Sequence, residues 1–489
     1  MASYILWVVG ALTAGVLNIF SPIARSDTGE ELASLLSKGA EIYLPTSIGF
    51  KNATARWNAG TKPGIDIVVK VKTEQDVQNA IRYANNHKKP FLAISGAHGQ
   101  TSTLNNIQSG LGIWMRGMTG IKIEGHIANL GGGIENGEVI RELWSAGKQT
   151  STTACDCAGF VAPVLGGGHG WLQGRYGLPA DQLISARLVL GNGTAITVSE
   201  YDHKDLFWAI RGAGHNYGIV TELEIKVYDR EPEQDQWATA AFTFRHDQLE
   251  AVFAIGNQWL TNATRPIELT HYGTIALDLA IDPIMPVFTF YVFWQGQSIP
   301  AIYTDPFYAL KPVNIVRKVT DLVGMNTHLA AGYGMAVCEK GYSHLLYPVS
   351  LDTWPIANLR KVLELFSSLP PEFRNSAMLL EAYATNRVNE IHADSTAFAD
   401  RSSQLLLSPV LTYAPNSSLD NAAFSIGENI RKTLIEGTGK RLITYVNYAH
   451  GDESLESIYG YDSWRLEKLK RLKREYDPEG RFNFYSPIK

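Results

Sequence analysis

The early part of the chain alternates short apolar runs with one amphipathic pattern. Residues 66–71 (Asp-Ile-Val-Val-Lys-Val) and 91–94 (Phe-Leu-Ala-Ile) predict two strands. Between them, four apolar residues from Val77 to Ala84 recur at helical spacing. Thr73 and Asp76 stand where a capping box would start that helix. The pattern therefore predicts a β-α-β unit at the start of the fold.

Further on, the pattern favours short strands joined by turns. Residues 110–133 are strand-like, and residues 138–144 suggest a short helix. The run 187–199 (Arg-Leu-Val-Leu-Gly-Asn-Gly-Thr-Ala-Ile-Thr-Val-Ser) predicts a hairpin, because Asn192-Gly193 is a favoured turn pair.

After Glu231-Pro232 the character of the chain changes. Longer strands rich in aromatic and β-branched residues are predicted over 236–245, 267–277, 286–294, 378–383 and 404–413. Helical patterns follow His246 and Leu351. This part predicts an antiparallel sheet with helices on one side, so the chain as a whole belongs to the α+β class. Residues 445–448 are predicted to form a strand, and residues 464–476 a terminal amphipathic helix.

Length and charge narrow the possibilities. The 489 residues exceed what one hydrophobic core usually supports, so two domains are expected. A net charge of −5 gives no support for nucleic-acid binding. Neither G-x-G-x-x-G nor Gly-Lys-Ser/Thr occurs, which disfavours a Rossmann dinucleotide site and a P-loop.

The N-terminus predicts a secretory signal. Residues 4–20 are uncharged and mostly apolar, but short for a membrane span, and cleavage is expected after Ser26. No Lys or Arg precedes the apolar run, which leaves an uncleaved anchor as the alternative. Passage through a secretory route is supported by four Asn-x-Ser/Thr sequons, at Asn52, Asn192, Asn262 and Asn416. No stable membrane association is expected.

Only three cysteines are present: Cys155, Cys157 and Cys338. Three cysteines make no disulfide framework, and no C-x-x-C pair suggests a metal site. Cys155 and Cys157 are too close in sequence for an easy bridge, so we expect buried or free thiols.

Four groups of glycine-rich or aromatic residues occur in a fixed order. The first is Ser95-Gly-Ala-His-Gly-Gln100, and the second runs from Gly159 through Gly166-Gly-Gly-His169 to Gly177. The third spans residues 205–221, and the last combines Tyr445-Val-Asn-Tyr448 with Tyr476-Asp-Pro478. Together they resemble the FAD-binding domain of the vanillyl-alcohol-oxidase superfamily, and most closely its berberine-bridge-enzyme-like oxidases.

The resemblance implies a two-domain FAD-binding fold of the PCMH type and covers nearly the whole chain. After the predicted signal peptide at 1–26, it implies an FAD-binding domain at 40–230 and a substrate-binding domain with an antiparallel sheet at 231–440. Residues 441–489 would return to the FAD-binding domain. A monomer with a small-molecule substrate is expected.

His98 is the key residue of the first loop. In the resembling family a histidine at this place is bonded covalently to the 8α-methyl of the flavin, whereas a loop histidine by itself would more often bond a backbone carbonyl. The resemblance places further cofactor-binding residues around it: Ser95, Gly96, Ala97, Gly99 and Gln100. Small residues there would let the backbone approach phosphate.

The second loop is expected to contribute Gly166, Gly167 and Gly168, whose backbone would approach the pyrophosphate or ribityl chain. His169 would donate to the N1–C2 carbonyl region of the flavin, although a structural histidine is a close alternative. The resemblance assigns four further cofactor contacts, at Gly174, Gly218, Val220 and Asn447.

Two valines distinguish this chain from many relatives. Val161 stands where those relatives carry a cysteine that forms a second covalent link, so a single link is expected. Cys157 lies four residues too early to replace that cysteine without a shift of the loop. Val164 occupies the position that resembles the oxygen gatekeeper of the family, where a valine leaves room for O₂.

Three residues are candidates for the catalytic base. Tyr448 and Tyr445 come from the predicted strand, in which residues three apart face opposite ways, so only one would point into the pocket. A tyrosine would need a lowered pKa or a neighbouring base to accept a hydroxyl proton. Glu381 is the third candidate, although a lone Glu at a strand edge is more often solvated.

The predicted function is an FAD-dependent oxidase. Hydride would pass from an alcohol or similar C–H of a small secondary metabolite to the flavin, with O₂ as acceptor and H₂O₂ as product. A carbohydrate oxidase is the first alternative, and a redox-neutral isomerase or cyclase on the same fold is the second. A secreted binding protein without activity is disfavoured by the intact His98 and both glycine loops.

Overall fold

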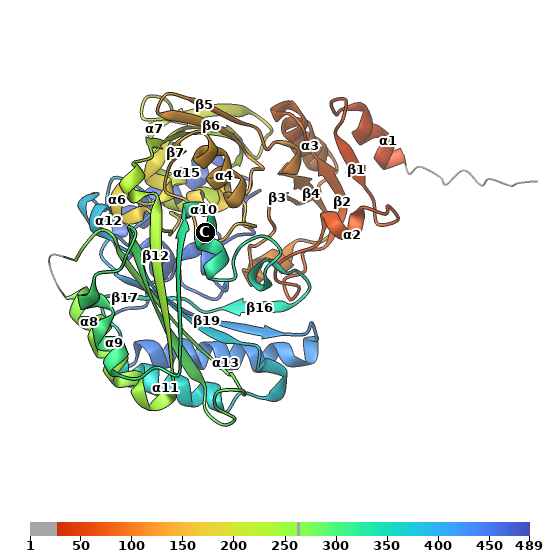
Figure 1. Ribbon diagram of the computed structural model, residues 1–489. Coiled ribbons are helices and arrows are strands. Elements are labelled where there is room, and N and C mark those ends of the chain that lie inside the picture. Colours follow the sequence, from red (N-terminus) through yellow and green to blue (C-terminus); the bar gives the residue numbers. More distant parts are fainter. Residues whose placement is uncertain (1–26, 262–264) are drawn as a thin grey trace, which may run out of the picture.

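A computed structural model describes residues 27–261 and 265–489. The predicted signal peptide and the sequon at Asn262 lie outside these residues. Figure 1 shows two sheet-containing regions in the upper half of the molecule and one large sheet with its helices below them. The mixture of helices with largely antiparallel sheets confirms the α+β prediction.

The predicted β-α-β unit is present at the start of the fold. Its members are β2 (Ile65–Lys70), α3 (Glu74–Asn86) and β3 (Phe91–Ile94). Thr73 accepts a hydrogen bond from the backbone of Asp76, which completes the expected capping box. The strands belong to a four-stranded sheet in the order β1-β2-β4-β3, with β1 (Glu41–Tyr43) and β4 (Gly110–Trp114). α1 (Asp27–Ser34) and α2 (Phe50–Ala53) flank this sheet.

A five-stranded antiparallel sheet follows, in the order β5-β6-β10-β8-β9. Its strands are β5 (Ile121–Glu124), β6 (Ile127–Gly131), β8 (Leu183–Val189), β9 (Ala195–Ser199) and β10 (Ile219–Lys226). β8 and β9 form the predicted hairpin, and Gly193 takes the positive φ of 80° that its turn requires. β7 (Lys148–Gln149) pairs separately with β11 (Tyr228–Asp229).

The large sheet is antiparallel and has eight strands. Seven follow the order β15-β12-β14-β13-β18-β19-β16, and β17 also pairs with β19. The strands are β12 (Gln236–Phe244), β13 (Leu269–Ala276), β14 (Val287–Gln295), β15 (Asn314–Asp321), β16 (Ser343–Leu346), β17 (Val349–Leu351), β18 (Ala377–Ala382) and β19 (Leu405–Tyr413). All five strands predicted in this part are confirmed.

Helices cover the lower face of the large sheet (Figure 1). They are α8 (Leu249–Leu260), α9 (Asp305–Ala309), α11 (Ile356–Ser367) and α13 (Ser417–Ile435). Their apolar sides and the facing residues of the sheet form one core, which includes Phe253, Phe290 and Leu363. Because this core occupies the lower face, the upper face is left to meet the other two sheets.

The remaining helices pack mainly around the upper sheets. They are α4 (Asn136–Ser145), α5 (Val161–Leu165), α6 (Gln173–Tyr176), α7 (Lys204–Ala213), α10 (Leu322–His328), α12 (Asn386–Glu390), α14 (Leu455–Tyr459) and α15 (Ser463–Tyr476). The last helix, α15, packs against elements far earlier in the chain, and Leu469 and Leu472 enter their core. The C-terminal segment therefore returns to the upper part of the molecule.

Two elements of the large sheet region lack a clear sequence signal. The residues Asn314–Val319 of the edge strand β15 are all exposed, so this strand shows no alternation of buried and exposed positions. The buried face of helix α13 is only partly apolar. The buried residues of this helix are Ala423, Gly427, Ile430, Arg431 and Leu434. Pairing with β12 holds β15 in place, and packing in the core of the large sheet holds α13.

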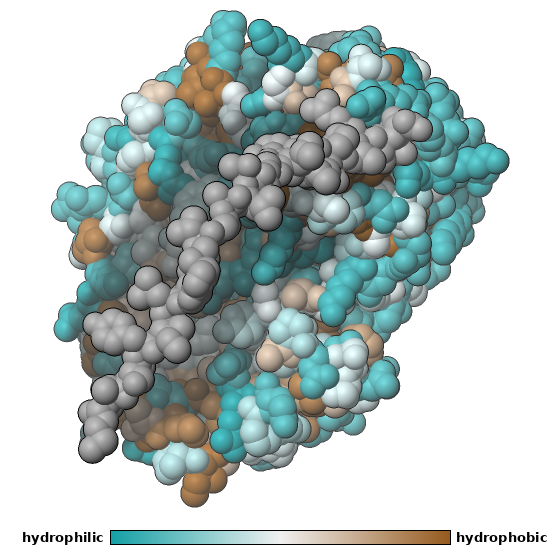
Figure 2. Space-filling model, turned by 90° about the vertical axis from the view of Figure 1, so that its right-hand side faces the viewer, coloured by the Kyte–Doolittle hydropathy of each residue, from teal (hydrophilic) through white to brown (hydrophobic). Residues whose placement is uncertain are grey.

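Among residues 27–261 and 265–489, no helix is long and apolar enough to span a membrane. The face seen in Figure 2 is largely hydrophilic, and its apolar residues lie in small separate groups.

Candidate active site

One large cavity lies between the upper sheets and the large sheet. Its volume is about 680 Å³, within the range of a binding site for a cofactor and a small ligand. Four parts of the chain supply most of its wall: the loop after β3, the segment 153–165, the end of the chain from Arg481 to Tyr485, and the upper face of β16, β18 and β19. No single part of the chain could form this site alone.

The first predicted loop forms one side of the cavity. β3 ends at Ile94, and all of the predicted residues from Ser95 to Gln100 line the cavity. Ala97 adopts a positive φ of 60°, which turns the chain sharply before His98. A side chain at Gly96 would overlap the carbonyl of Cys157, so the two loops pack backbone to backbone.

His98 lies in this wall as a neutral imidazole. Its Nε2 is buried and has no hydrogen-bond partner within the described part of the chain. Burial lowers the pKa of His98 to about 3, and the nearby positive charges of Lys340 and Arg56 act in the same direction. A neutral ring with a free nitrogen is the form in which histidine acts as a nucleophile.

The second predicted loop is placed differently from the first. Val161 lines the cavity, whereas Val164 is fully buried and packs in the core of the five-stranded sheet region. Gly166, Gly167 and Gly168 lie outside the cavity wall, where side chains would overlap Asn447, Phe398 and Pro179 respectively. These glycines therefore serve close packing in this structure, and Gly174 likewise faces Ala384.

Other predicted cofactor contacts do reach the cavity. These are His169, Gly218, Val220 and Asn447. The Nδ1 of His169 lies 3.0 Å from Oε1 of Gln173, and burial lowers the pKa of this histidine. The amide of Asn447 donates to the carbonyl of Pro163 and to the hydroxyl of Tyr445.

The predicted strand at 445–448 is wrong. Residues Val446–Tyr448 form a 3₁₀ helix, in which positions three apart lie on the same side. The rings of Tyr445 and Tyr448 are consequently neighbours, with centroids 5.1 Å apart, and both line the cavity. Alternation along a strand cannot therefore decide between the two tyrosines.

Glu381 is buried rather than solvated. It belongs to β18, an interior strand between β13 and β19, and is 6% exposed. Burial raises the pKa of its carboxyl to about 7, while hydrogen bonding by Tyr383 and Tyr448 acts in the opposite direction. The hydroxyl of Tyr383 donates to Oε1 of Glu381 at 3.2 Å. Oε2 has no hydrogen-bond partner of ordinary geometry within the described residues.

The tyrosines around Glu381 hold their protons firmly. Burial raises the pKa of Tyr448, and the charge of Glu381 adds to the effect. The same two causes raise the pKa of Tyr383. Of this cluster, the carboxyl of Glu381 has the pKa nearest to neutrality. Its neighbour Tyr448 lines the cavity.

The expectation of free thiols is wrong for two of the three cysteines. Cys157 and Cys338 form a disulfide across 181 residues, which links the cavity segment to a loop of the large sheet region. Cys155 is free and lines the cavity, and burial raises its thiol pKa to about 11. Ligand atoms of His98, Cys155 and Cys157 lie within 4.8 Å of one another, but the disulfide removes the thiolate that a metal would need.

Sequence reasoning missed several residues of the site. Arg56 and Trp57 precede every motif. His344 comes from β16 and Tyr383 directly follows β18, and neither strand carries a motif. Arg56 donates from Nη2 to the carbonyl of Gly99, and burial lowers its pKa to about 10. Only Tyr383 could have been found from sequence, because it stands two residues after Glu381 in the predicted strand 378–383.

The comparisons with known proteins agree with this geometry. Residues 65–199 match the family model described as FAD binding domain, and residues 444–489 match that described as Berberine and berberine like. The FAD-linked oxidoreductase chyH of Penicillium rubens is 37% identical, with 99% of this chain and 98% of the relative covered. The FAD-linked oxidoreductase chry5 of Gibberella zeae is 36% identical, with coverage of 98% and 97%.

The chain belongs to the berberine-bridge-enzyme-like FAD-linked oxidoreductases. Solved structures confirm the fold of this oxidoreductase. Physcomitrella patens BBE-like 1 has a TM-score of 0.80 at 22% identity, covering 95% of this chain and 100% of that chain. The glucooligosaccharide oxidase from Acremonium strictum has a TM-score of 0.80 at 20% identity, covering 95% and 99%.

The cavity of the oxidoreductase fits FAD. Its volume suits a large cofactor, and the backbone of the first loop borders it. The orphaned Nε2 of His98 offers a buried attachment atom, and Gly218 and Val220 flank the same space. The first loop, the segment around Val161, the start of β10 and Asn447 would hold the cofactor.

Proposed function

We propose that this oxidoreductase is an oxidase that takes a hydride from an alcohol carbon of a small, largely apolar metabolite. The observation that carries the proposal is the buried carboxyl of Glu381, which has a pKa of about 7 and neighbours the cavity-lining Tyr448. When bound, FAD supplies the hydride acceptor and passes the electrons to O₂. The protein must supply a route for the hydroxyl proton.

Tyr448 and Glu381 are proposed to form that route together. The raised pKa of Tyr448 makes the phenol a poor base by itself at neutral pH. It can accept a substrate proton while its own proton moves to the carboxylate of Glu381. Tyr445 is the weaker candidate because its hydroxyl accepts a hydrogen bond from the amide of Asn447.

The wall that the large sheet gives to the cavity favours an apolar ligand. β18 and β19 present Ala377, Leu379 and Val410 to the cavity, and Leu346 adds to this surface. Thr412 is a polar exception on the same face. An apolar wall with few polar groups favours a compact metabolite over a sugar, which needs many hydrogen bonds.

A carbohydrate is the second candidate substrate. Several structural neighbours are named as oligosaccharide oxidases, including a xylooligosaccharide oxidase from Myceliophthora thermophila. A redox-neutral isomerase or cyclase is the third candidate. Oxygen use does not rest on Val164, since its side chain faces the core and not the cavity.

A single covalent link between His98 and FAD is part of the proposal. It is supported by the neutral ring and free Nε2 of His98, and by the absence of a cysteine at position 161. The glucooligosaccharide oxidase is described as carrying both a histidyl and a cysteinyl link. We also propose a monomer that enters the secretory route.

Two measurements test the proposal. Mass spectrometry of tryptic peptides should find the flavin on the peptide that contains His98, and flavin on a cysteine peptide would contradict the single histidyl link. Mixing with a panel of apolar alcohols without oxygen should bleach the flavin absorbance, and admission of air should restore it with formation of H₂O₂. Product without any bleaching would favour the isomerase alternative.

A further inference from the structure

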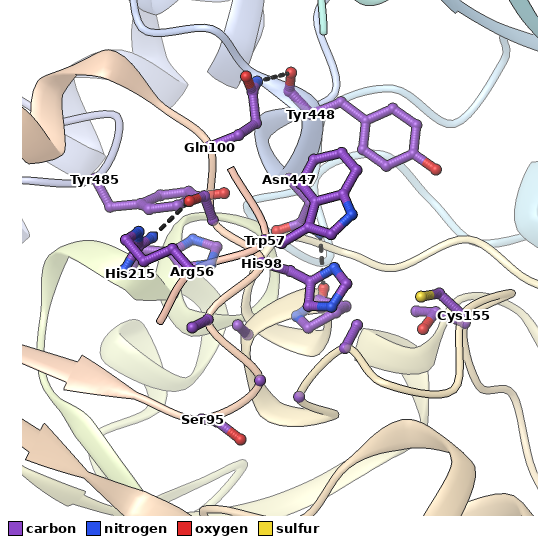
Figure 3. A pocket seen from close by; sticks show the side chains of 18 of the residues that line it. Arg56, Trp57, Ser95, His98, Gln100, Cys155, His215, Asn447, Tyr448 and Tyr485 are labelled. Carbon is purple, nitrogen blue, oxygen red and sulfur yellow. Dashed lines mark hydrogen bonds between the residues drawn. The ribbon is translucent and has the colours of Figure 1, made fainter. Parts of the chain in front are cut away.

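Trp57 lies between two histidines of the cavity wall. It follows α2 and is 8% exposed. Its ring centroid lies 5.5 Å from that of His98, with an interplanar angle of 12°, and 4.3 Å from that of His344, with an angle of 15°. The three rings are therefore nearly parallel, and Figure 3 shows the Trp57 indole close to the His98 ring.

Two hydrogen bonds anchor Trp57, one from its backbone and one from its indole. The backbone N–H of Trp57 donates to the carbonyl of Ala97 at 3.1 Å, which ties it to the loop that carries His98. Its Nε1–H donates to the carbonyl of Val337 at 2.8 Å. Val337 adjoins Cys338, whose disulfide to Cys157 holds that segment beside the cavity.

The far end of the stack is also anchored. His344 belongs to β16, and its Nδ1 lies 3.1 Å from the hydroxyl oxygen of Thr412 on β19. Burial lowers the pKa of His344 to about 4, so this ring is neutral at physiological pH. The large sheet thereby holds the stack at one end, while the ring of His98 lies at the other.

His98 itself lacks such anchoring at Nε2, which has no partner within the described residues. The stacked contact with Trp57 is therefore a feature that restricts rotation of its ring. We propose that Trp57, backed by His344, is a positioning residue that orients His98 for covalent attachment of FAD. This inference rests on the histidyl link of the proposed function.

Attachment requires a defined ring orientation because the bond joins a nitrogen of His98 to the 8α carbon of the cofactor. One hydrogen leaves the methyl group and one leaves the imidazole, and O₂ takes up both with two electrons as H₂O₂. Small errors in the position of a reacting atom reduce such rates by about a hundredfold. Trp57 contributes no atom to the bond.

The test compares acid-stable flavin with total flavin in purified full-length variants. Trp57→Phe keeps an aromatic face but loses the bond to Val337, whereas Trp57→Leu loses both. We expect Trp57→Phe to resemble the wild type and Trp57→Leu to attach flavin at least about tenfold more slowly. Trp259→Leu is the matched control, since Trp259 is also 8% exposed but lies in the large core.

Equal attachment in Trp57→Leu and wild type would overturn the inference. Equal impairment of the Phe and Leu variants would also overturn it, because the hydrogen bond to Val337 would then be responsible. If Trp57→Leu does not fold, His344→Leu decides, and unchanged attachment there counts against the stack. Complete release of flavin from the wild type by acid would instead refute the histidyl link, and the inference with it.

Discussion

The region around His98 and the cluster around Glu381 show opposite effects of the same burial. Around the histidine, burial lowers the pKa of His98 to about 3 and leaves a neutral nucleophile. In the second cluster, burial raises the pKa of Glu381 to about 7, so its carboxyl titrates near neutral pH. Loss of water always penalises the charged form, so it weakens proton binding by a base and strengthens it for an acid.

The largest expected effect concerns His98. Replacing His98 by Ala removes the attachment nitrogen, so all flavin should enter the supernatant after acid precipitation. His215→Ala is a matched control, because His215 lines the same cavity and its pKa is also lowered, to about 4, by burial. Acid-stable flavin in His98→Ala would place the link elsewhere.

Tyr448→Phe should affect the cluster around Glu381. Removal of the hydroxyl breaks the proton route to Glu381, and loss of a general base typically slows a reaction by about a hundredfold or more. Tyr445→Phe should have a smaller effect, because Tyr445 is bonded to Asn447. The measurement is the anaerobic bleaching rate with an accepted alcohol. Equal rates in wild type and Tyr448→Phe would exclude this tyrosine.

Glu381→Gln should change the pH dependence. The wild-type bleaching rate should rise as pH increases through about 7, because the carboxyl then becomes able to accept a proton. This rise with pH should disappear in the Gln variant. If the rise remains in the Gln variant, it belongs to another titrating group.

The same substitution has a consequence for stability. The folded-state pKa of Glu381 is raised, so its carboxyl costs stability as pH rises from 4.5 through about 7. Glu381→Gln should therefore stabilise the protein more at pH 8 than at pH 4, as measured by thermal unfolding. A gain that is the same at both pH values would contradict the raised pKa.

The smallest effect is expected for the disulfide. Cys338→Ser releases a link that closes a loop across 181 residues, and such links typically stabilise by about 2–4 kcal/mol. Thermal unfolding should show a lower midpoint that no longer responds to reductant. Cys155→Ser is the control and should keep the response, because Cys155 is free.

Much of the upper region could be predicted from the sequence. The β-α-β unit, the hairpin at Gly193 and the loop around His98 rest on local signals, namely helical periodicity, a cap and turn residues. The five predicted strands of the large sheet were also clear, because alternation and aromatic content are local properties.

The proton-handling cluster shows where local signals end. The sequence named Glu381, Tyr445 and Tyr448, but it could not show that the carboxyl is buried. It also predicted a strand where Val446–Tyr448 form a 3₁₀ helix, because three residues are too few for a period to be recognised.

The sequence by itself determined the fold class, most of the strands of the large sheet and the family. The tertiary structure alone decided the pairing of Cys157 with Cys338, the stack of Trp57 with His98 and His344, and the pKa of Glu381. These features join positions far apart in the chain, and they depend on distance and burial after folding. Neither quantity is encoded by the spacing of residues along the sequence.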